Sequence, residues 1–184
     1  MIYVALLRGI NVGGKNKIDM KLLKETFRRV GMKSVVTYIN SGNVIFVDDK
    51  HTKDEIAELL EKGIFDDFNL RIKVLIRSLD AFEKMMSVLP ASWSNDNNMR
   101  ADVLFLWDEV DQQTARSQLV IKPDIDTVLF FPGGILWAVD RKNVTRSGLT
   151  KVVGTDLYRK ITVRNVNTTR KIYEMMKELN KSCE

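Results

Sequence analysis

The spacing of apolar and polar positions along the first 33 residues predicts one strand followed by one helix. An apolar run at residues 2–7 stops at a polar, glycine-rich segment, RGINVGGKNK, at residues 8–17. Apolar residues then recur at the helical spacing 20, 23, 27 and 30. Asp19 is expected to cap this helix at its N-terminus, and Gly31 is expected to end it.

The pattern continues with a hairpin, a second helix and a fourth strand. β-Branched runs at 35–39 and 44–47 flank Asn-Ser-Gly-Asn, a sequence typical of a hairpin turn. Thr52 and Glu55 are spaced as a capping box before a second series of apolar residues. A strand is expected at 72–77. The order β-α-β-β-α-β is that of a ferredoxin-like unit.

The second half predicts the same order after a linking helix. Ser78 is expected to cap a helix at 79–89 that Pro90 ends, and the polar stretch 91–100 is expected to be a loop. The elements expected after it are strand 102–107, helix 110–119, strands 127–131 and 135–139, helix 149–158, strand 160–164 and helix 168–180.

The chain is therefore predicted to be an α+β protein of two tandem β-α-β-β-α-β (ferredoxin-like) units with antiparallel sheets, plus the linking helix and a C-terminal helix. The expected domains are residues 1–78, a linking helix and loop at 79–101, and residues 102–184 with the C-terminal helix. The strands of the second half are apolar on both faces, whereas a sheet with one wet face should alternate. Both faces of that sheet are expected to be covered.

Composition places the chain among globular proteins. It has 184 residues, of which 45% are hydrophobic and 29% charged. No apolar stretch is long enough to cross a bilayer, and no secretory signal is visible, so no membrane partner is expected. The single cysteine, Cys183, excludes a disulfide framework within the chain. A reducing cytoplasm is the expected location.

Charge is concentrated in two basic blocks around an acidic middle. The net charge is +5, with +6 in residues 1–33 and +8 in residues 141–171, against −8 in residues 34–140. This arrangement indicates an anionic partner, with solvated charged faces that never meet as the alternative.

The glycine-rich segment nearly matches a P-loop but departs from it in two ways. Residues 9–15 fit G-x-x-x-x-G-K, but Asn16 stands where a Ser or Thr would hold Mg²⁺. The helix is expected to begin near Asp19 rather than at the lysine, and the sheet is expected to be antiparallel. Ordinary nucleotide hydrolysis is disfavoured, whereas the backbone amides and cations still suit a phosphate or carboxylate.

Three other types of site are considered and disfavoured. Residues 2–7 and 42–47 resemble RNA-recognition strands, but with Tyr3 facing outward the same face would add only Ala5, Leu7 and Phe46, and the basic aromatic signature of those modules is absent. RNA binding through the sheet is therefore disfavoured, and binding through the loops stays open. One histidine, His51, and one cysteine cannot form a Cys/His zinc site or support a triad. The paired aspartates at 48–49 and 66–67 are expected to be caps or solvated ends.

A second basic segment, RNVNTTRK at residues 164–171, also lies between a predicted strand and a helix. Asn167 or Thr168 is expected to cap that helix. Arg170 and Lys171 fall in its first turn, where cations oppose the helix dipole, and a bound anion would remove that conflict.

The motifs ALLRGINVGGK (5–15), YINSGNV (38–44) and RNVNT (164–168) resemble a widespread bacterial family, domain of unknown function 1697. The resemblance covers nearly the whole chain and implies a duplicated β-α-β-β-α-β protein. It implies no biochemical function. The family's motif positions correspond to Arg8, Asn11, Gly13, Gly14, Lys15, Ser41, Gly42, Asn43, Arg164, Asn165, Asn167 and Thr168.

Three hypotheses follow from these motifs. In the favoured one, the two basic loops converge on one anionic ligand, a phosphorylated small molecule or nucleotide. In the second, the same loops bind RNA or DNA without catalysis, and in the third they serve folding alone. The candidate ligand-binding residues are Arg8, Asn11, Gly13, Gly14, Lys15, Ser41, Asn43, Arg164, Asn165, Asn167 and Thr168. No cofactor, catalytic residue, metal site or oligomeric state can be assigned, and catalysis is left open.

Overall fold

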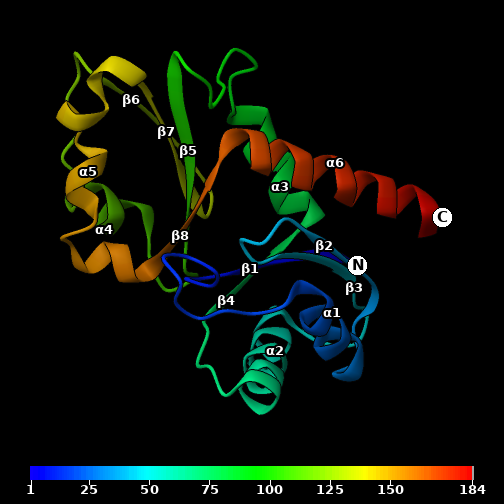
Figure 1. Ribbon diagram of the computed structural model, residues 1–184. Helices are drawn as coiled ribbons and strands as arrows, with labels where there is room; N and C mark the ends of the chain where they lie inside the picture. The colour runs from blue at the N-terminus through cyan, green and yellow to red at the C-terminus, as the bar shows by residue number, and fades with distance from the viewer. Residues whose placement is uncertain (184) are drawn as a thin grey trace. The chain divides into compact units, whose positions relative to one another are not determined.

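The computed structural model describes residues 1–183 and divides the chain into two compact units (Figure 1). Unit 1 contains Met1–Phe82 together with the chain from Ile172 onward, and unit 2 contains Glu83–Lys171. Each unit holds one four-stranded antiparallel sheet. The predicted α+β class with two tandem β-α-β-β-α-β units is confirmed.

Unit 1 has the strand order β2-β3-β1-β4, with β1 paired to both β3 and β4 in antiparallel register. Its elements are β1 (Ile2–Leu7), α1 (Met20–Arg29), β2 (Lys33–Tyr38), β3 (Asn43–Val47), α2 (Lys53–Phe68) and β4 (Val74–Ser78). All six predicted elements of this half are present. Their observed ends differ from the predicted ends by only a few residues.

Local capping signals decide where the helices of unit 1 begin. The carboxylate of Asp19 accepts hydrogen bonds from the backbone N–H of Lys21 (2.7 Å) and Leu22 (3.1 Å). Thr52 and Glu55 form the reciprocal capping box predicted for α2. Both predicted caps are confirmed, because each satisfies backbone donors that the first helical turn leaves unpaired.

Tyr3 faces the helices of unit 1 and not an open sheet surface. It is buried in the core that α1 and α2 form with the sheet, and its ring stacks on Phe46 at a centroid distance of 5.9 Å. Phe46 in turn meets Phe27 of α1 edge-on. The outward orientation that RNA-recognition strands require is therefore absent, and base stacking on these aromatics is excluded.

Unit 2 repeats the topology in the order β6-β7-β5-β8. Its elements are β5 (Met99–Leu106), α4 (Gln112–Ser117), β6 (Asp126–Phe131), β7 (Gly134–Asp140), the 3-10 helix η1 (Arg141–Arg146), α5 (Leu149–Val152), the 3-10 helix η2 (Asp156–Lys160) and β8 (Ile161–Asn165). Trp137 and Leu104 are fully buried in the core beneath α4 and α5.

The helices of unit 2 are shorter than predicted. The helix expected at 149–158 is only the single turn α5, and η2 follows it. Gly154 falls between the two, where glycine disfavours a continuing helix. By contrast, the prediction that the strands are covered on both faces is confirmed for β5 and β7, whose consecutive residues are buried along most of each strand. It is wrong for β6, where residues 128–130 are only half-buried.

Two further helices, α3 (Leu79–Val88) and α6 (Val166–Cys183), each contribute residues to both units. The hydroxyl of Ser78 accepts a hydrogen bond from the N–H of Ala81 (3.3 Å), which confirms the predicted cap of α3. The sequence predicts that the whole C-terminal helix belongs to the second domain, residues 102–184. In the structure its residues from Ile172 group with unit 1 instead.

Candidate functional site

The RGINVGGKNK loop of unit 1 forms a miniature hairpin. The N–H of Lys15 donates to the carbonyl of Val12 (3.0 Å), and the N–H of Asn11 donates to the carbonyl of Asn16 (3.1 Å). Gly13 and Gly14 form the turn with φ values of 58° and 76°. Two successive positive φ values define a type I′ turn, which glycine adopts without strain. This geometry differs from a P-loop, whose helix begins at the lysine.

Asn11 fixes this hairpin to the rest of unit 1. Its amide oxygen accepts from the N–H of Ile18 (2.8 Å), and its amide nitrogen donates to the carbonyls of Ile18 (3.0 Å) and Asn40 (2.9 Å). Asn16 adds a hydrogen bond from its amide nitrogen to the carbonyl of Gly9 (2.9 Å). The Asn11 side chain therefore shapes the loop.

The second motif, in the β2–β3 turn, supports the base of the loop. The N–H of Leu7 donates to the carbonyl of Gly42 (2.9 Å). A Cβ at Gly42, where φ is +77°, would lie 2.7 Å from the Leu7 Cβ, so a side chain does not fit. Asn43 is fully buried and donates to the carbonyl of Tyr38 (3.1 Å) and the hydroxyl of Ser41 (2.9 Å).

The tip of the loop presents polar groups to solvent. Gly13, Gly14, Lys15 and Lys17 are exposed, and Arg8 at the base is half-buried. Within residues 1–183, no hydrogen bond or ion pair engages the side chains of Lys15 and Lys17 or the N–H groups of Gly13 and Gly14. These are the groups of the first motif that a ligand can reach.

In unit 2, the RNVNTTRK segment forms the end of β8 and the start of α6. The amide oxygen of Asn165 accepts from the N–H of Thr168 (2.9 Å), and its carbonyl accepts from the hydroxyl of Thr169 (2.9 Å). The expected cap at Asn167 or Thr168 was wrong, because α6 begins at Val166 and Asn165 supplies the cap.

Asn167 and Arg170 hold the Asn-rich loop that precedes β5. Asn167 accepts from the N–H of Asn95 (3.1 Å) and donates to its carbonyl (2.9 Å). The guanidinium of Arg170 donates to the carbonyls of Pro90 (2.8 Å) and Trp93. These carbonyl oxygens accept donors of the Arg170 guanidinium at the start of α6. The third hypothesis, a folding role, fits these two residues.

Replacing Asn167 by alanine is expected to lower the free energy of unfolding by about 1–2 kcal/mol, because two hydrogen bonds to Asn95 are lost at an exposed position. Urea denaturation followed by tryptophan fluorescence measures the change, and hydrogen exchange at the Asn95 amide locates it. Asn97→Ala, an exposed change in the same loop, is the control. Equal stability of the two variants would show that the hydrogen bonds between Asn167 and Asn95 do not stabilise the protein.

Arg164 is buried within unit 2, unlike the cations at the tip of the first loop. Its guanidinium donates to the hydroxyl of Thr162 (3.0 Å) and to the carbonyl of Val163 (2.9 Å). Burial lowers the pKa of Arg164 to about 10, which still leaves it protonated at neutral pH.

The family described as "Protein of unknown function (DUF1697)" matches residues 1–137. The chain belongs to this family. It is also similar to the solved structure of the conserved bacterial protein SP0830 from Streptococcus pneumoniae, with 33% identity, a TM-score of 0.82, and coverage of 95% of this chain and 98% of that chain. A search of curated proteins finds no match. The resemblance seen in the sequence is thus confirmed. The family match establishes the fold but assigns no activity.

The described residues of this DUF1697 protein contain no candidate metal-ligand cluster and no candidate membrane-spanning helix. Across residues 1–183, no group of three or more His, Cys, Asp or Glu side chains is placed to hold a metal ion. None of the helices described is long and apolar enough to cross a membrane. His51 contacts Asp48 through its Nδ1 atom (2.9 Å), and the carboxylate of Asp48 also accepts backbone N–H groups, so the pair closes the turn before α2.

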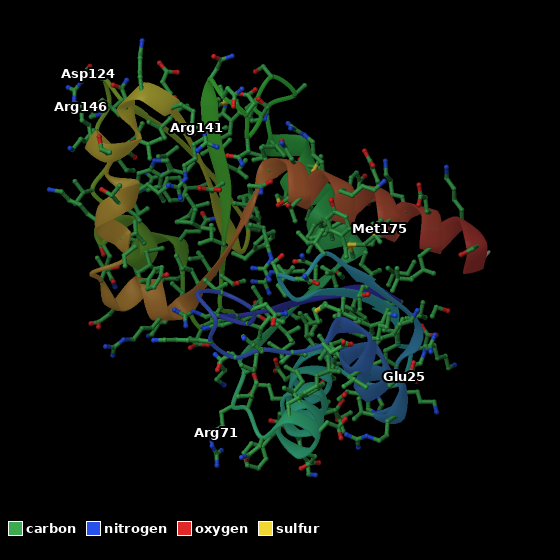
Figure 2. The ribbon with its side chains drawn as sticks, viewed as in Figure 1. Glu25, Arg71, Asp124, Arg141, Arg146 and Met175 are labelled. Atoms are coloured by element: carbon green, nitrogen blue, oxygen red, sulfur yellow. The ribbon has the colours of Figure 1, made fainter. Side chains whose placement is uncertain are left out.

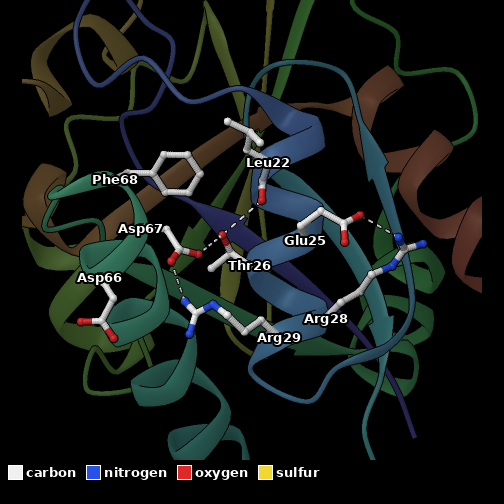
Figure 3. Close-up of a pocket in the computed structure, with 8 residues that line it drawn as sticks. All are labelled: Leu22, Glu25, Thr26, Arg28, Arg29, Asp66, Asp67 and Phe68. Carbon is white, nitrogen blue, oxygen red and sulfur yellow. Dashed lines mark hydrogen bonds and ion pairs between the residues drawn. The ribbon is translucent and has the colours of Figure 1, made fainter.

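A hollow between α1 and α2 in unit 1 carries charges that are already paired (Figure 3). Asp67 accepts from the hydroxyl of Thr26 (2.6 Å) and forms an ion pair with Arg29 (2.9 Å). Glu25 pairs with Arg28 (2.7 Å). The contacts of Asp67 join α2 to α1, whereas the Glu25–Arg28 pair lies within α1. Hydrogen bonds from Thr26 and Arg29 hold the pKa of Asp67 below its usual value. The hollow offers a ligand little uncompensated charge.

A pocket that was not predicted from the sequence lies at the same end of the unit 1 sheet as the loop. Phe65, Arg71 and Lys73 surround a pocket beside the start of β4. The N–H of Arg8 donates to the carbonyl of Lys73 (3.0 Å), which joins this segment to the base of the loop. The cations that flank Ile72 in the sequence Arg-Ile-Lys were the available signal, because alternate residues of an extended segment project to one side.

Proposed function

We propose that the RGINVGGKNK loop of unit 1 binds the phosphate groups of a phosphorylated small molecule or nucleotide. One observation carries the proposal: the exposed Gly13–Gly14 turn offers two backbone N–H groups with no partner among residues 1–183, next to Lys15 and Lys17, whose side chains also lack one there. Cations and backbone N–H donors together are the groups that proteins use to hold phosphate.

The surroundings of the turn support close approach of an anion. A Cβ at Gly13 or Gly14 would meet no atom within 4 Å, so the space beside both residues is open. Asn11 and Asn43 hold the backbone in place, and pre-ordered donors lose less entropy on binding. Arg8, Gly13, Gly14 and Lys15 are therefore proposed as direct contacts, and Asn11, Ser41 and Asn43 as residues that shape the loop.

The Lys15→Gln/Lys17→Gln double variant is expected to bind inorganic tripolyphosphate about tenfold more weakly than the wild-type protein. Lys15 is proposed to contact the anion and Lys17 adds a neighbouring positive charge, and a tenfold loss corresponds to about 1.4 kcal/mol. Titration calorimetry measures the affinity. In parallel, ¹H–¹⁵N spectra should show dose-dependent shifts of the Gly13 and Gly14 amides in the wild-type protein.

The matched control is Lys33→Gln/Lys50→Gln, which removes the same charge from exposed lysines of unit 1 outside the loop. This control should retain wild-type affinity. Equal weakening in both double variants would attribute binding to net charge alone and would refute the loop site. Arg164→Lys, titrated in the same way, tests the C-terminal motif separately.

Nucleic-acid binding is the second candidate function. It is favoured by a further exposed lysine, Lys21 in the first turn of α1, in addition to Lys15 and Lys17. A polymer that contacts several phosphates should lose affinity steeply as salt rises. The test measures the affinity of the protein for a single-stranded oligonucleotide and for tripolyphosphate. Nucleic-acid binding would be favoured if the oligonucleotide bound more tightly and if its affinity fell by orders of magnitude between low and moderate salt.

A further inference from the structure

We infer that the ligand is a nucleotide whose base occupies a pocket beside Phe65 while its phosphates reach the loop. The inference rests on the proposed phosphate site and adds the chemical class of the ligand. The pocket has a volume of about 480 Å³ and is lined by Glu61, Lys62, Phe65, Arg71, Ile72 and Lys73. That volume falls within the range of ordinary small-molecule sites.

The lining has the groups that hold a nucleobase. Phe65, in the last turn of α2, is 37% exposed, although large aromatic side chains are usually covered. The guanidinium carbon of Arg71 lies 4.8 Å from the centre of the Phe65 ring. Aromatic rings and guanidinium planes are the surfaces on which proteins stack bases. We assign the exposed ring of Phe65 and the neighbouring guanidinium as the stacking platform for one flat base.

Polar groups beside the platform can read the edge of a base. The carboxylate of Glu61 accepts the N–H of Val74 (3.1 Å) through one oxygen, and its other oxygen is 3.5 Å from the ammonium of Lys73. This second contact is long and exposed, so that oxygen can accept a hydrogen bond from an amino group of a base. The site therefore combines a stacking surface with a hydrogen-bond acceptor.

The pocket and the loop are connected through the backbone of unit 1. Leu7 at the end of β1 pairs with Val74 at the start of β4, and the N–H of the next residue, Arg8, donates to the carbonyl of Lys73 (3.0 Å). The pocket thus adjoins the base of the loop. The two residues joined by this hydrogen bond, Arg8 and Lys73, both carry positive charge, which suits the phosphates of a nucleotide.

The test compares ATP with inorganic tripolyphosphate, which carries similar phosphate groups without a base. Stacking on an aromatic side chain is expected to make ATP bind about 5- to 100-fold more tightly. Phe65→Ala should remove most of this gain and leave tripolyphosphate binding unchanged. Arg71→Gln, an exposed change that does not endanger the core, should reduce the gain as well. Saturation-transfer NMR should show contact between the protein and the base protons of ATP.

The control is Tyr158→Ala in unit 2, an aromatic residue with the same 37% exposure. It should leave both affinities unchanged. Equal affinity for ATP and tripolyphosphate, or a gain for ATP that survives both Phe65→Ala and Arg71→Gln, would overturn the base pocket while the phosphate site stands. If neither ATP nor tripolyphosphate bound to the protein, the phosphate site itself would be refuted.

Discussion

Replacing Asp126 by asparagine is expected to lower the free energy of unfolding of unit 2 by about 3 kcal/mol, because the change replaces one acceptor oxygen by an NH₂ donor that faces buried donors. Asp126 is buried at the start of β6. One carboxylate oxygen accepts from the indole of Trp137 (3.1 Å) and the hydroxyl of Ser147. The other accepts from the N–H groups of Lys122 (3.0 Å) and Gly148 (2.9 Å).

The asparagine amide can replace only one of these two oxygens. Its NH₂ group would face two N–H donors that have no other acceptor nearby, or else the indole and the hydroxyl. The backbone is closely packed at this point, because a Cβ at Gly148 would lie 1.5 Å from the carbonyl oxygen of Val120. The loop before α5 is therefore tightly packed against the segment before β6.

The pH dependence follows from the same contacts. Burial alone would raise the pKa of Asp126, but the hydrogen bonds from Ser147, Lys122, Gly148 and Trp137 outweigh it and hold the pKa below its usual value. A carboxyl whose folded pKa is lowered stabilises the fold above its unfolded pKa of about 3.9 and loses that contribution as pH falls through the folded pKa. The stability difference between wild type and Asp126→Asn should be constant near neutral pH and shrink below about pH 4.

Tryptophan fluorescence can measure this effect in unit 2 alone, because all three tryptophans, Trp93, Trp107 and Trp137, lie in residues 83–171. Asp124→Asn, an exposed change two residues away (Figure 2), is the control and should alter stability by less than about 0.5 kcal/mol. A wild-type denaturation midpoint for Asp126→Asn would show that the buried carboxylate is dispensable.

Patterns of neighbouring residues predicted the fold, whereas contacts between distant residues decided the roles at the site. Asp19 and the Thr52–Glu55 box were predictable because a cap involves residues only two or three positions apart. The bond between Asn167 and Asn95 spans 72 positions, and the sequence carries no local sign of it. Asn and Thr are equally suited to ligands and to backbone carbonyls. Their assignment to folding therefore needed the structure.

The same limit explains the partial success of the first motif. The glycines, Lys15 and the delayed helix were interpretable from the sequence, because a turn with two positive φ values is a local property. The pocket beside Phe65 could not be predicted from the sequence, because it forms where the end of α2 lies near the residues that precede β4. Nothing in the spacing of Phe65 and Arg71 indicates that the guanidinium lies over the ring.

Replacing Asn11 by alanine is expected to destabilise unit 1 by about 2–4 kcal/mol and to abolish tripolyphosphate binding at the loop. The change removes three hydrogen bonds to the backbone of Ile18 and Asn40. It also places alanine at a φ of 53°, a left-handed conformation that costs a non-glycine residue about 1 kcal/mol. Hydrogen exchange of peptides covering residues 8–19 and 38–44 measures the loss locally.

Asn11→Gly separates the two contributions, because glycine adopts the left-handed conformation without strain but makes none of the side-chain hydrogen bonds. It should recover about 1 kcal/mol of the stability lost in Asn11→Ala and should still fail to bind, since the hairpin is no longer fixed. Asn16→Gly, which removes only the bond to Gly9, should have a smaller effect on both quantities. If Asn11→Gly bound tripolyphosphate with wild-type affinity, the fixing of the hairpin by the Asn11 side chain would not be needed for anion binding. Asn11 would then act in folding alone.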